Sequence, residues 1–454
     1  MRTSWVAVAA LLLACALVQA AGLPVLAVLP PTDEGAQCSW GPGIAAAVTD
    51  ALSESGQYVV LSDEQVLSAL GHAGSISSAG AEAAGLLQAD VVIHGRLTRQ
   101  PDLRVELQVT GAPLAIAGVE AEDAAHLLQQ TCAAVAAAFG LPEPASGRLT
   151  DSPDAAVAFL EARFHHCRFE DADAALEGYR RALADDADFA LARYQYANLL
   201  REIGRWEEAR SEYQRAMQAG DWPRAASNLA SVRFVLDDVP DAESIWRDVA
   251  GQSLDPLAAA YATNNLGTVL LARSDVGGAE GQYRSALNLW PGYAMATANL
   301  GLLEQVRKNY GAAVGHLQIA ASQRSDLKAA AFAEKTWGDV LRQEKSYSAA
   351  IEHYRRALEL QPEYAMAQVN MGVTYKQMGS MGEAEECYRQ AILLGNNPTA
   401  MAYAHNNLGN LYMAQSMYRL AAGEYEKALS LKPDYQAASD NLSKARQRIQ
   451  QQGR

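Results

Sequence analysis

The chain has 454 residues, half of them apolar and a fifth charged, as in soluble proteins with a sizeable core. Its formal net charge of −15 argues against nucleic acid as a partner, because polyphosphate repels an acidic surface. The five cysteines are too few for a disulfide scaffold, and no two of them have the spacing of zinc ligands.

The N-terminal stretch MRTSWVAVAALLLACALVQAAGLP is typical of an export signal. Arg2 supplies the positive charge, residues 6–18 are apolar, and residues 18–20 fit a cleavage site. We therefore expect a signal peptide over residues 1–20 and a soluble, exported, periplasmic protein without a transmembrane segment in its mature chain. An alternative interpretation uses LLAC as a lipoprotein box, which would anchor the chain to the membrane through Cys15.

Residues 22–142 alternate strand and helix patterns and predict a small α/β sandwich. The alternating run at 103–110 is expected to be the antiparallel partner of the strand before it. The expected strands cover residues 25–30, 58–61, 89–99 and 103–110, and the expected helices cover 44–55, 64–70, 81–88 and 121–139. Cys38 and Cys132 both lie in this region and could form a disulfide.

The order of these segments resembles the amino-terminal domain family of TolB. The segments that carry the resemblance are LAVLP, IAAAVTDALSES, YVVLSD, QADVVIHGRL and LRVELQV. Pro31 stands where the family usually has Phe, and the segment GAPLAIAGVE has no clear place in the pattern. The resemblance implies a domain that is often joined to helical repeats, and residues 143–153 are the expected linker.

From residue 154 to 435 one pattern recurs. Leu266-Gly267, for example, is followed by Ala279, Tyr283, Ala286 and Pro291, and later Leu-Gly pairs keep these offsets. Small residues let two helices approach closely, the aromatic residues fill the space between them, and Pro ends the second helix. The repeat starts are separated alternately by about 34 and 37 residues, so the segments AYATNNLG, AFAEKTWG and AYAHNNLG recur every 71 residues.

This pattern resembles the tetratricopeptide repeat (TPR) family, in which helix pairs stack into a right-handed α-solenoid. We predict a mainly α chain with about eight repeats, preceded by the small α/β domain. Residues 436–454 are expected to form a cap helix and tail. The resemblance implies a protein or peptide ligand in the groove of the array.

No nucleotide, metalloprotease or serine-hydrolase motif is present in the sequence. The run His165-His166-Cys167 invites a metal interpretation, but His166 falls on an aromatic position of the first repeat, so packing is favoured. Cys167 and Cys387 are expected to be free and partly buried. We therefore expect a chain that is not an enzyme and that has no catalytic residue, metal site or cofactor.

Asparagine stands just before most of the Leu-Gly pairs, although it is a poor helix former. This row consists of Asn228, Asn265, Asn299, Asn370, Asn407 and Asn441, and Thr336 interrupts it. The residues four positions earlier share its helix face and are Arg224, Tyr261, Met295, Phe332, Met366 and Tyr403. The row resembles the asparagine ladder of O-linked N-acetylglucosamine transferases, which implies that it binds a peptide backbone. The alternative is that each asparagine bonds a neighbouring helix or water.

These features favour an exported adaptor in which the groove binds an extended protein segment and the α/β domain binds a second envelope protein. Two alternatives remain open. One is a ligand-sensing accessory module for a membrane signalling protein, and the other is a subunit of an envelope assembly or secretion machine.

Overall fold

The computed structural model describes residues 24–33, 40–53, 58–61, 66, 89–98, 103–139, 148–168, 172–220, 222–323, 326–395 and 397–452. The chain divides into two compact units, residues 1–296 and 297–454, which are named here the N-terminal and C-terminal units. The expected signal peptide, Cys15 and Cys38 lie outside the described residues, as do residues 143–147 of the expected linker. Of the expected helices 64–70 and 81–88, only residue 66 is described.

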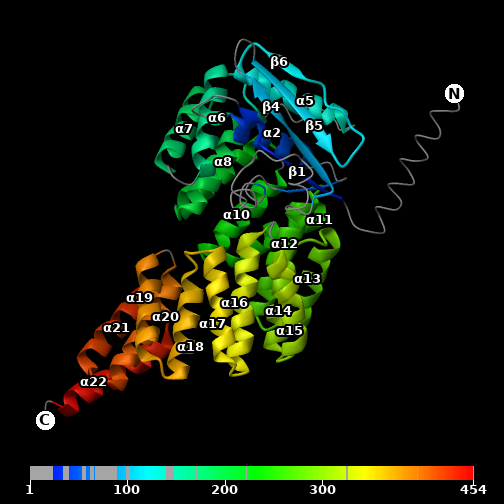
Figure 1. Ribbon diagram of the computed structural model, residues 1–454. Helices are drawn as coiled ribbons and strands as arrows, with labels where there is room; N and C mark the ends of the chain where they lie inside the picture. Colours follow the sequence, from blue (N-terminus) through cyan, green and yellow to red (C-terminus); the bar gives the residue numbers. More distant parts are fainter. Residues whose placement is uncertain are drawn as a thin grey trace. The chain divides into compact units, whose positions relative to one another are not determined.

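A mixed sheet opens the N-terminal unit (Figure 1). Its strands are β1 (Val25–Val28), β2 (Thr32–Asp33), β3 (Val59–Val60), β4 (Val91–Thr98), β5 (Leu103–Thr110) and β6 (Val119–Ala121). The strand order is β3-β1-β4-β5-β6, and β2 pairs with β4 beyond the end of β1. β1 is parallel to β3 and β4, whereas β4 and β5, and β5 and β6, pair in antiparallel orientation. The antiparallel pairing of β4 with β5 was expected from the sequence. The last strand was not predicted from the sequence.

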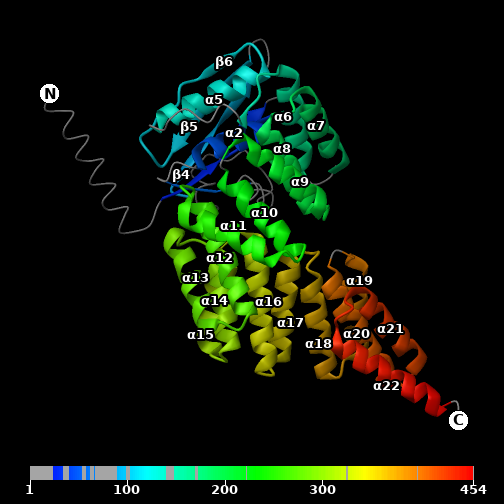
Figure 2. The same cartoon turned by 180° about the vertical axis from the view of Figure 1, so that it is seen from behind.

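Two helices, α2 (Gly41–Ser53) and α5 (Ala124–Ala138), cover one face of this sheet (Figures 1 and 2). Leu26, Val28 and Ile93 point towards this side and are buried with residues of both helices. The core continues without a break into the first repeat, because α2 and α5 also pack against α6 (Pro153–Arg168). The α/β region is therefore joined to the array by a common core within the N-terminal unit.

In the described residues, eight helix pairs and a final helix follow, which confirms the predicted repeat array. The first helices of the pairs are α6, α8 (Ala190–Glu202), α10 (Pro223–Val235), α12 (Pro256–Ala272), α14 (Ala294–Val306), α16 (Leu327–Gln343), α18 (Ala365–Met378) and α20 (Pro398–Ala414). The second helices are α7 (Ala172–Asp185), α9 (Trp206–Ala216), α11 (Val239–Gln252), α13 (Val276–Leu289), α15 (Tyr310–Ser322), α17 (Tyr347–Leu360), α19 (Met381–Leu394) and α21 (Tyr418–Leu431). A 3₁₀ turn, η2 (Met217–Ala219), follows α9, and α22 (Gln436–Gln452) ends the described chain.

The 71-residue period has a structural cause. Helices α12, α16 and α20 have 17 residues each, whereas α10, α14 and α18 have 13 or 14. Each long helix starts one turn earlier, at an N-cap side chain that accepts a hydrogen bond from a backbone N–H of the first turn: Asp255, Asp326 and Asn397. From α12 onward, the double repeat is thus defined by a capped extension of every second first helix, whereas α8 has 13 residues and no such cap.

From α12 to α20, a glycine stands where each first helix meets its second helix, whereas α8 and α10 have Ala197 and Ala230 at this position. A Cβ on Gly338 would lie 2.7 Å from the Tyr354 ring, and one on Gly409 would lie 2.5 Å from the Tyr425 ring. Both tyrosines are buried, so the rings have little room to move. The Leu-Gly and Tyr positions recur together because the glycine makes room for the ring.

Candidate functional site

The asparagine row lies on one face of the first helices, together with the residues four positions before it. This face is called the row face below. Three members of the row donate a hydrogen bond to the first helix of the preceding repeat, 30 or 31 residues earlier. The donor–acceptor pairs are Asn228 Nδ2 with Asn198 Oδ1 at 3.0 Å, Asn370 Nδ2 with Asp339 Oδ1 at 2.8 Å, and Asn441 Nδ2 with Asn410 Oδ1 at 3.1 Å.

Each of these acceptors also accepts a hydrogen bond from the buried tyrosine of its own repeat. The pairs are Tyr213 Oη with Asn198 at 2.6 Å, Tyr354 Oη with Asp339 at 2.8 Å, and Tyr425 Oη with Asn410 at 2.8 Å. One polar side chain therefore joins three helices. The alternative interpretation of the row expects such contacts between neighbouring helices. The contacts do not test whether the row also binds a peptide.

The acceptor position directly follows the small residue that recurs in each repeat (Ala or Gly), and it was not predicted from the sequence. It is polar in every second repeat, where it is Asn198, Thr268, Asp339 and Asn410. In the repeats between, it is apolar at Leu302 and Val373, and at Ser231 the hydroxyl donates to the Ser227 carbonyl of its own helix at 3.0 Å. Within the described residues, the buried hydroxyl of Tyr388 has no hydrogen-bond partner, and its repeat carries Val373 at this position. The 71-residue alternation could have revealed the acceptors.

The other row positions differ from these three. Asn265 Oδ1 accepts a 3.4 Å hydrogen bond from Asn264, and Asn299 is buried. Thr336 is fully buried, and its hydroxyl donates to the Phe332 carbonyl at 2.8 Å. Asn407 is half-buried, and its side chain has no hydrogen-bond partner among residues that the structure describes. Asn407 is therefore the row member most available to a ligand.

On the C-terminal unit, the aromatic and methionine positions of the row face are half-buried. Lys335 Nζ lies 5.0 Å from the centre of the Phe332 ring and 3.1 Å from Asp339. The rings of Tyr403 and Tyr435 meet edge to face with their centres 5.2 Å apart. Met366 packs against the core of the seventh and eighth repeats. This face offers aromatic and methionine surface next to polar groups.

On the N-terminal unit, the sheet itself covers the row face. Ala27, Leu29, Val59 and Val92 form one buried cluster with residues of α12 and the turn after α13. Tyr261 and Met295 pack against this cluster, and the Tyr261 ring contacts those of Trp290 and Tyr293. The two side chains predicted to line an open groove here therefore contact the chain's own core.

Arg224, where other repeats have Tyr, Phe or Met, makes the polar part of this contact. Its Nη2 donates to the Val60 carbonyl of β3 at 2.7 Å, and its Nε lies 2.5 Å from Asp255. Burial alone would lower the pKa of Arg224, but the Asp255 carboxylate raises it. Arg224, which departs from the row pattern, thus binds the sheet through a hydrogen bond.

The covered face of the sheet is apolar only as far as the array extends over it. Beyond Val92, the same face continues with His94, Arg96 and Thr98 on β4, and the last two are exposed. On β5 it carries Arg104, which is ion-paired with Glu106 at 2.9 Å. This charged surface is open to solvent.

His166 and Cys132 are both buried. His166 is buried, with Nδ1 2.8 Å from Tyr179 Oη and Nε2 3.2 Å from Glu202, which agrees with the packing role predicted for it. In the described residues, no group of histidine, cysteine and carboxylate side chains is arranged to hold a metal ion. Burial raises the pKa of the Cys132 thiol. Since Cys38 is outside the described residues, its pairing with Cys132 stays a prediction.

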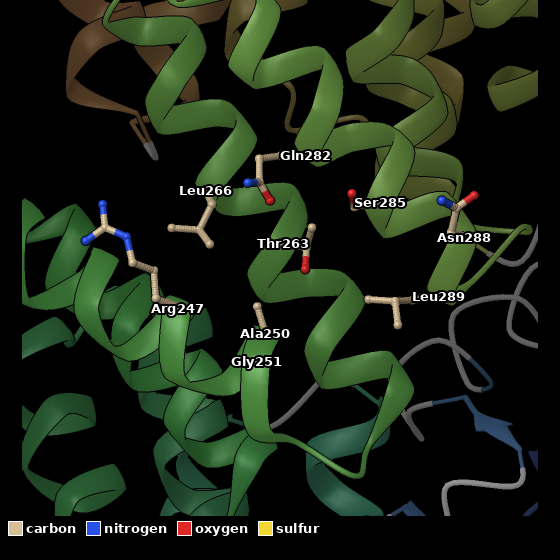
Figure 3. Close-up of a pocket in the computed structure, with 9 residues that line it drawn as sticks. All are labelled: Arg247, Ala250, Gly251, Thr263, Leu266, Gln282, Ser285, Asn288 and Leu289. Atoms are coloured by element: carbon tan, nitrogen blue, oxygen red, sulfur yellow. The ribbon is translucent and has the colours of Figure 1, made fainter.

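An open surface pocket of 470 Å³, called the cavity below, lies between α11, α12 and α13, and Arg247, Gly251, Ser285 and Asn288 of its lining are exposed (Figure 3). Arg247, Ala250 and Gly251 line it from α11, and Thr263 and Leu266 line it from α12. The side from α13 is lined by Gln282, Ser285, Asn288 and Leu289. Thr263 and Leu266 are turned away from the row positions of α12 at 100° per residue, so the cavity and the row face lie on opposite sides of that helix.

Comparison with known proteins identifies the repeats. Residues 338–379 match the family "TPR repeat", and residues 264–328, 367–395 and 402–435 match "Tetratricopeptide repeat" families. Within the part of the chain that the structure describes, no helix is long and apolar enough to cross a membrane.

Protein O-mannosyl-transferase TMTC3 of Homo sapiens is 32% identical over 119 residues, and its Mus musculus counterpart is 31% identical over 119 residues. Each alignment covers 23% of this chain and 13% of the relative, so the chain spans about an eighth of the length of these curated relatives. The crystal structure of MamA matches with 24% identity and a TM-score of 0.30, over 37% of this chain and 94% of that one. The Cut9–Hcn1 hetero-tetramer of the APC/C matches with 16% identity and a TM-score of 0.41, over 63% and 62%.

Helix pairs of this kind suggest a scaffold for protein–protein interaction, and the family matches and the observed array together show that the chain contains tetratricopeptide repeats.

Proposed function

We propose that the chain is a non-enzymatic adaptor that binds an extended protein segment on the row face of its C-terminal unit. The observation that carries this proposal is the difference between the two units. On the N-terminal unit the sheet packs against Tyr261 and Met295, whereas the equally half-buried Phe332, Met366 and Tyr403 belong to clusters formed by repeat residues alone, and Asn407 has an amide without a partner in the described chain. An amide supplies both the donor and the acceptor that a peptide unit needs.

The proposal includes export to the periplasm and a second partner for the α/β region, which resembles the TolB amino-terminal domain. The signal-like residues 1–20 support export. The exposed charged face of β4 and β5 is the surface that we assign to the second envelope protein. Cross-linking and pull-down from the native envelope distinguishes the alternatives. A membrane kinase or cyclase among the products favours sensing, and outer-membrane or secretion proteins favour assembly.

A binding experiment tests the C-terminal row face. Peptides are selected on the full chain from a random library, and their affinity is measured for Asn407→Ala. We expect a loss of about fivefold, the value of one net hydrogen bond, with an unchanged melting temperature. Glu426→Ala, on the exposed side of α21, is the matched control and should bind normally. Selected peptides that bind Asn407→Ala, Met366→Ser and the wild type equally would show that the row face is not the site.

A further inference from the structure

The cavity between α11, α12 and α13 exists because one repeat lacks a contact that its counterparts have. At the equivalent place in three other double repeats, a charged pair joins the first helix to the second. These pairs are Arg193–Glu212, Glu334–His353 and His405–Glu424, each at 2.6 Å. In the fourth, the two positions are Thr263 and Gln282, 70 residues after the first pair and 71 before the second.

Neither the Thr263 nor the Gln282 side chain fills the space between α12 and α13. The Thr263 hydroxyl donates to the Ala259 carbonyl of its own helix at 2.7 Å, so it is turned along α12. Gln282 is half-buried, and its side chain has no hydrogen-bond partner within the described residues. The space that an ion pair fills elsewhere is left open here (Figure 3).

The walls of the cavity favour an uncharged ligand. Gln282, Ser285 and Asn288 follow one another at intervals of three on α13, and none of their side chains has a hydrogen-bond partner in the described chain. Leu266 and Leu289 supply apolar surface, and the opposite wall is small at Gly251. The only charged lining residue, Arg247, is already paired with Glu243 at 2.6 Å.

The spacing fits a main chain. Three residues of rise separate successive members of the polar wall, so it extends over roughly 9 Å, about the length of three extended residues. Amide and hydroxyl groups can donate to and accept from peptide units in turn. The cavity volume of 470 Å³ lies in the range of ligand pockets.

We propose that this cavity is a second binding site, which takes a short extended segment of a partner protein. The main chain lies along the polar wall of α13, and one uncharged apolar side chain enters between Leu266 and Gly251. The site lies on the side of α12 opposite to the row face, so it does not depend on the function proposed for that face.

Methyl NMR of the full chain tests this site with the blocked tripeptide acetyl-Gly-Leu-Gly-amide. We expect the methyl signals of Leu266 and Leu289 to shift in a saturable way, and acetyl-Gly-Gly-Gly-amide to bind at least roughly tenfold more weakly. N-methylacetamide is the probe for a small-molecule amide site. If it shifts the same signals as tightly as the tripeptide, the segment proposal is wrong.

Two variants fill the cavity. A Cβ on Gly251 meets no atom within 4 Å, so Gly251→Leu extends into the space without a clash. Gly281→Leu is the control, because this exposed residue also has no atom near its Cβ and does not line the cavity. We expect the first variant to lose the tripeptide response and the control to keep it.

The second way to fill the cavity is the double variant Thr263→Glu with Gln282→His, which introduces the charged pair that Glu334 and His353 form in the equivalent repeat. This double variant should abolish tripeptide binding while the melting temperature stays the same or rises. It replaces Gly251→Leu as the test if that variant folds poorly. Absence of any shift in the wild type, or equal shifts in the wild type and a folded filled variant, would overturn the proposal.

Discussion

The buried tyrosines of the second helices show how one polar side chain on the first helix determines whether a buried hydroxyl has a hydrogen-bond partner. Tyr354 donates to Asp339, which also accepts from Asn370 and Lys335. The hydroxyl of Tyr388 is buried without a partner in the described chain. An unpaired buried hydroxyl costs free energy, whereas a paired one stabilises the fold.

Replacing these tyrosines by phenylalanine should therefore have opposite effects. We expect Tyr354→Phe to lower the free energy of unfolding by about 1 kcal/mol, because Asp339 loses a donor. Tyr388→Phe should leave it unchanged or raise it by up to about 1 kcal/mol. Chemical denaturation of the two variants measures both values. A larger loss for Tyr388→Phe than for Tyr354→Phe would contradict this account of the polar network.

The same burial makes stability sensitive to high pH. Burial raises the pKa of Tyr425 from 10.0 to about 12, and burial with the nearby Glu386 raises that of Cys387 from 9.0 to about 11. Both groups hold their protons more tightly in the folded chain than in the unfolded one. Their contribution is therefore complete below pH 9 and is lost as the pH rises through 11 and 12.

Melting temperatures recorded from pH 8 upward should be constant at first and then fall above about pH 9. In Cys387→Ala the decline above pH 9 should be shallower, because only Cys132 and the buried tyrosines still titrate. A wild-type melting temperature that stays flat to pH 12 would show that these groups are not buried in solution.

At the scale of the element, the helix pairs could be predicted because small and aromatic residues recur at fixed offsets. β6 could not, since only Val119–Ala121 pairs with β5 and the preceding GAPLAIAG has no alternation. The polar acceptors such as Asp339 were missed because a charged residue in a helix usually faces solvent. Arg224 broke the row pattern visibly, but only the structure shows Val60 as its partner.

The close approach of first and second helices gives a matched pair of glycine variants. Gly338→Ala places a Cβ 2.7 Å from Tyr354, whose hydroxyl is held by Asp339, and should cost about 1–3 kcal/mol. Gly423→Ala meets no atom within 4 Å on α21 and should stabilise by about 0.5–1 kcal/mol. Thermal unfolding measures both changes, and equal effects at the two sites would contradict the packing described.

At the scale of the whole molecule, the sheet is held on the array of the N-terminal unit by apolar contacts and by Arg224. Asp255 is fully buried beside this arginine, so Arg224→Met leaves a buried carboxylate unpaired and should cost about 3–5 kcal/mol. Adding Asp255→Asn should restore much of this loss, since Asn397 caps α20 in the same way. If the double variant is no more stable than Arg224→Met, the unpaired Asp255 carboxylate is not the source of the loss.

The central claim is that the C-terminal row face binds the protein ligand while the sheet covers that of the N-terminal unit. Hydrogen exchange of the full chain, with and without a peptide selected on it, tests this directly. We predict that the peptide slows exchange in α16, α18 and α20, with little change in β1, β3 and α12, whose contacts already exist in the unbound chain. Protection confined to the N-terminal unit, or to the second helices of the C-terminal unit, would contradict the claim.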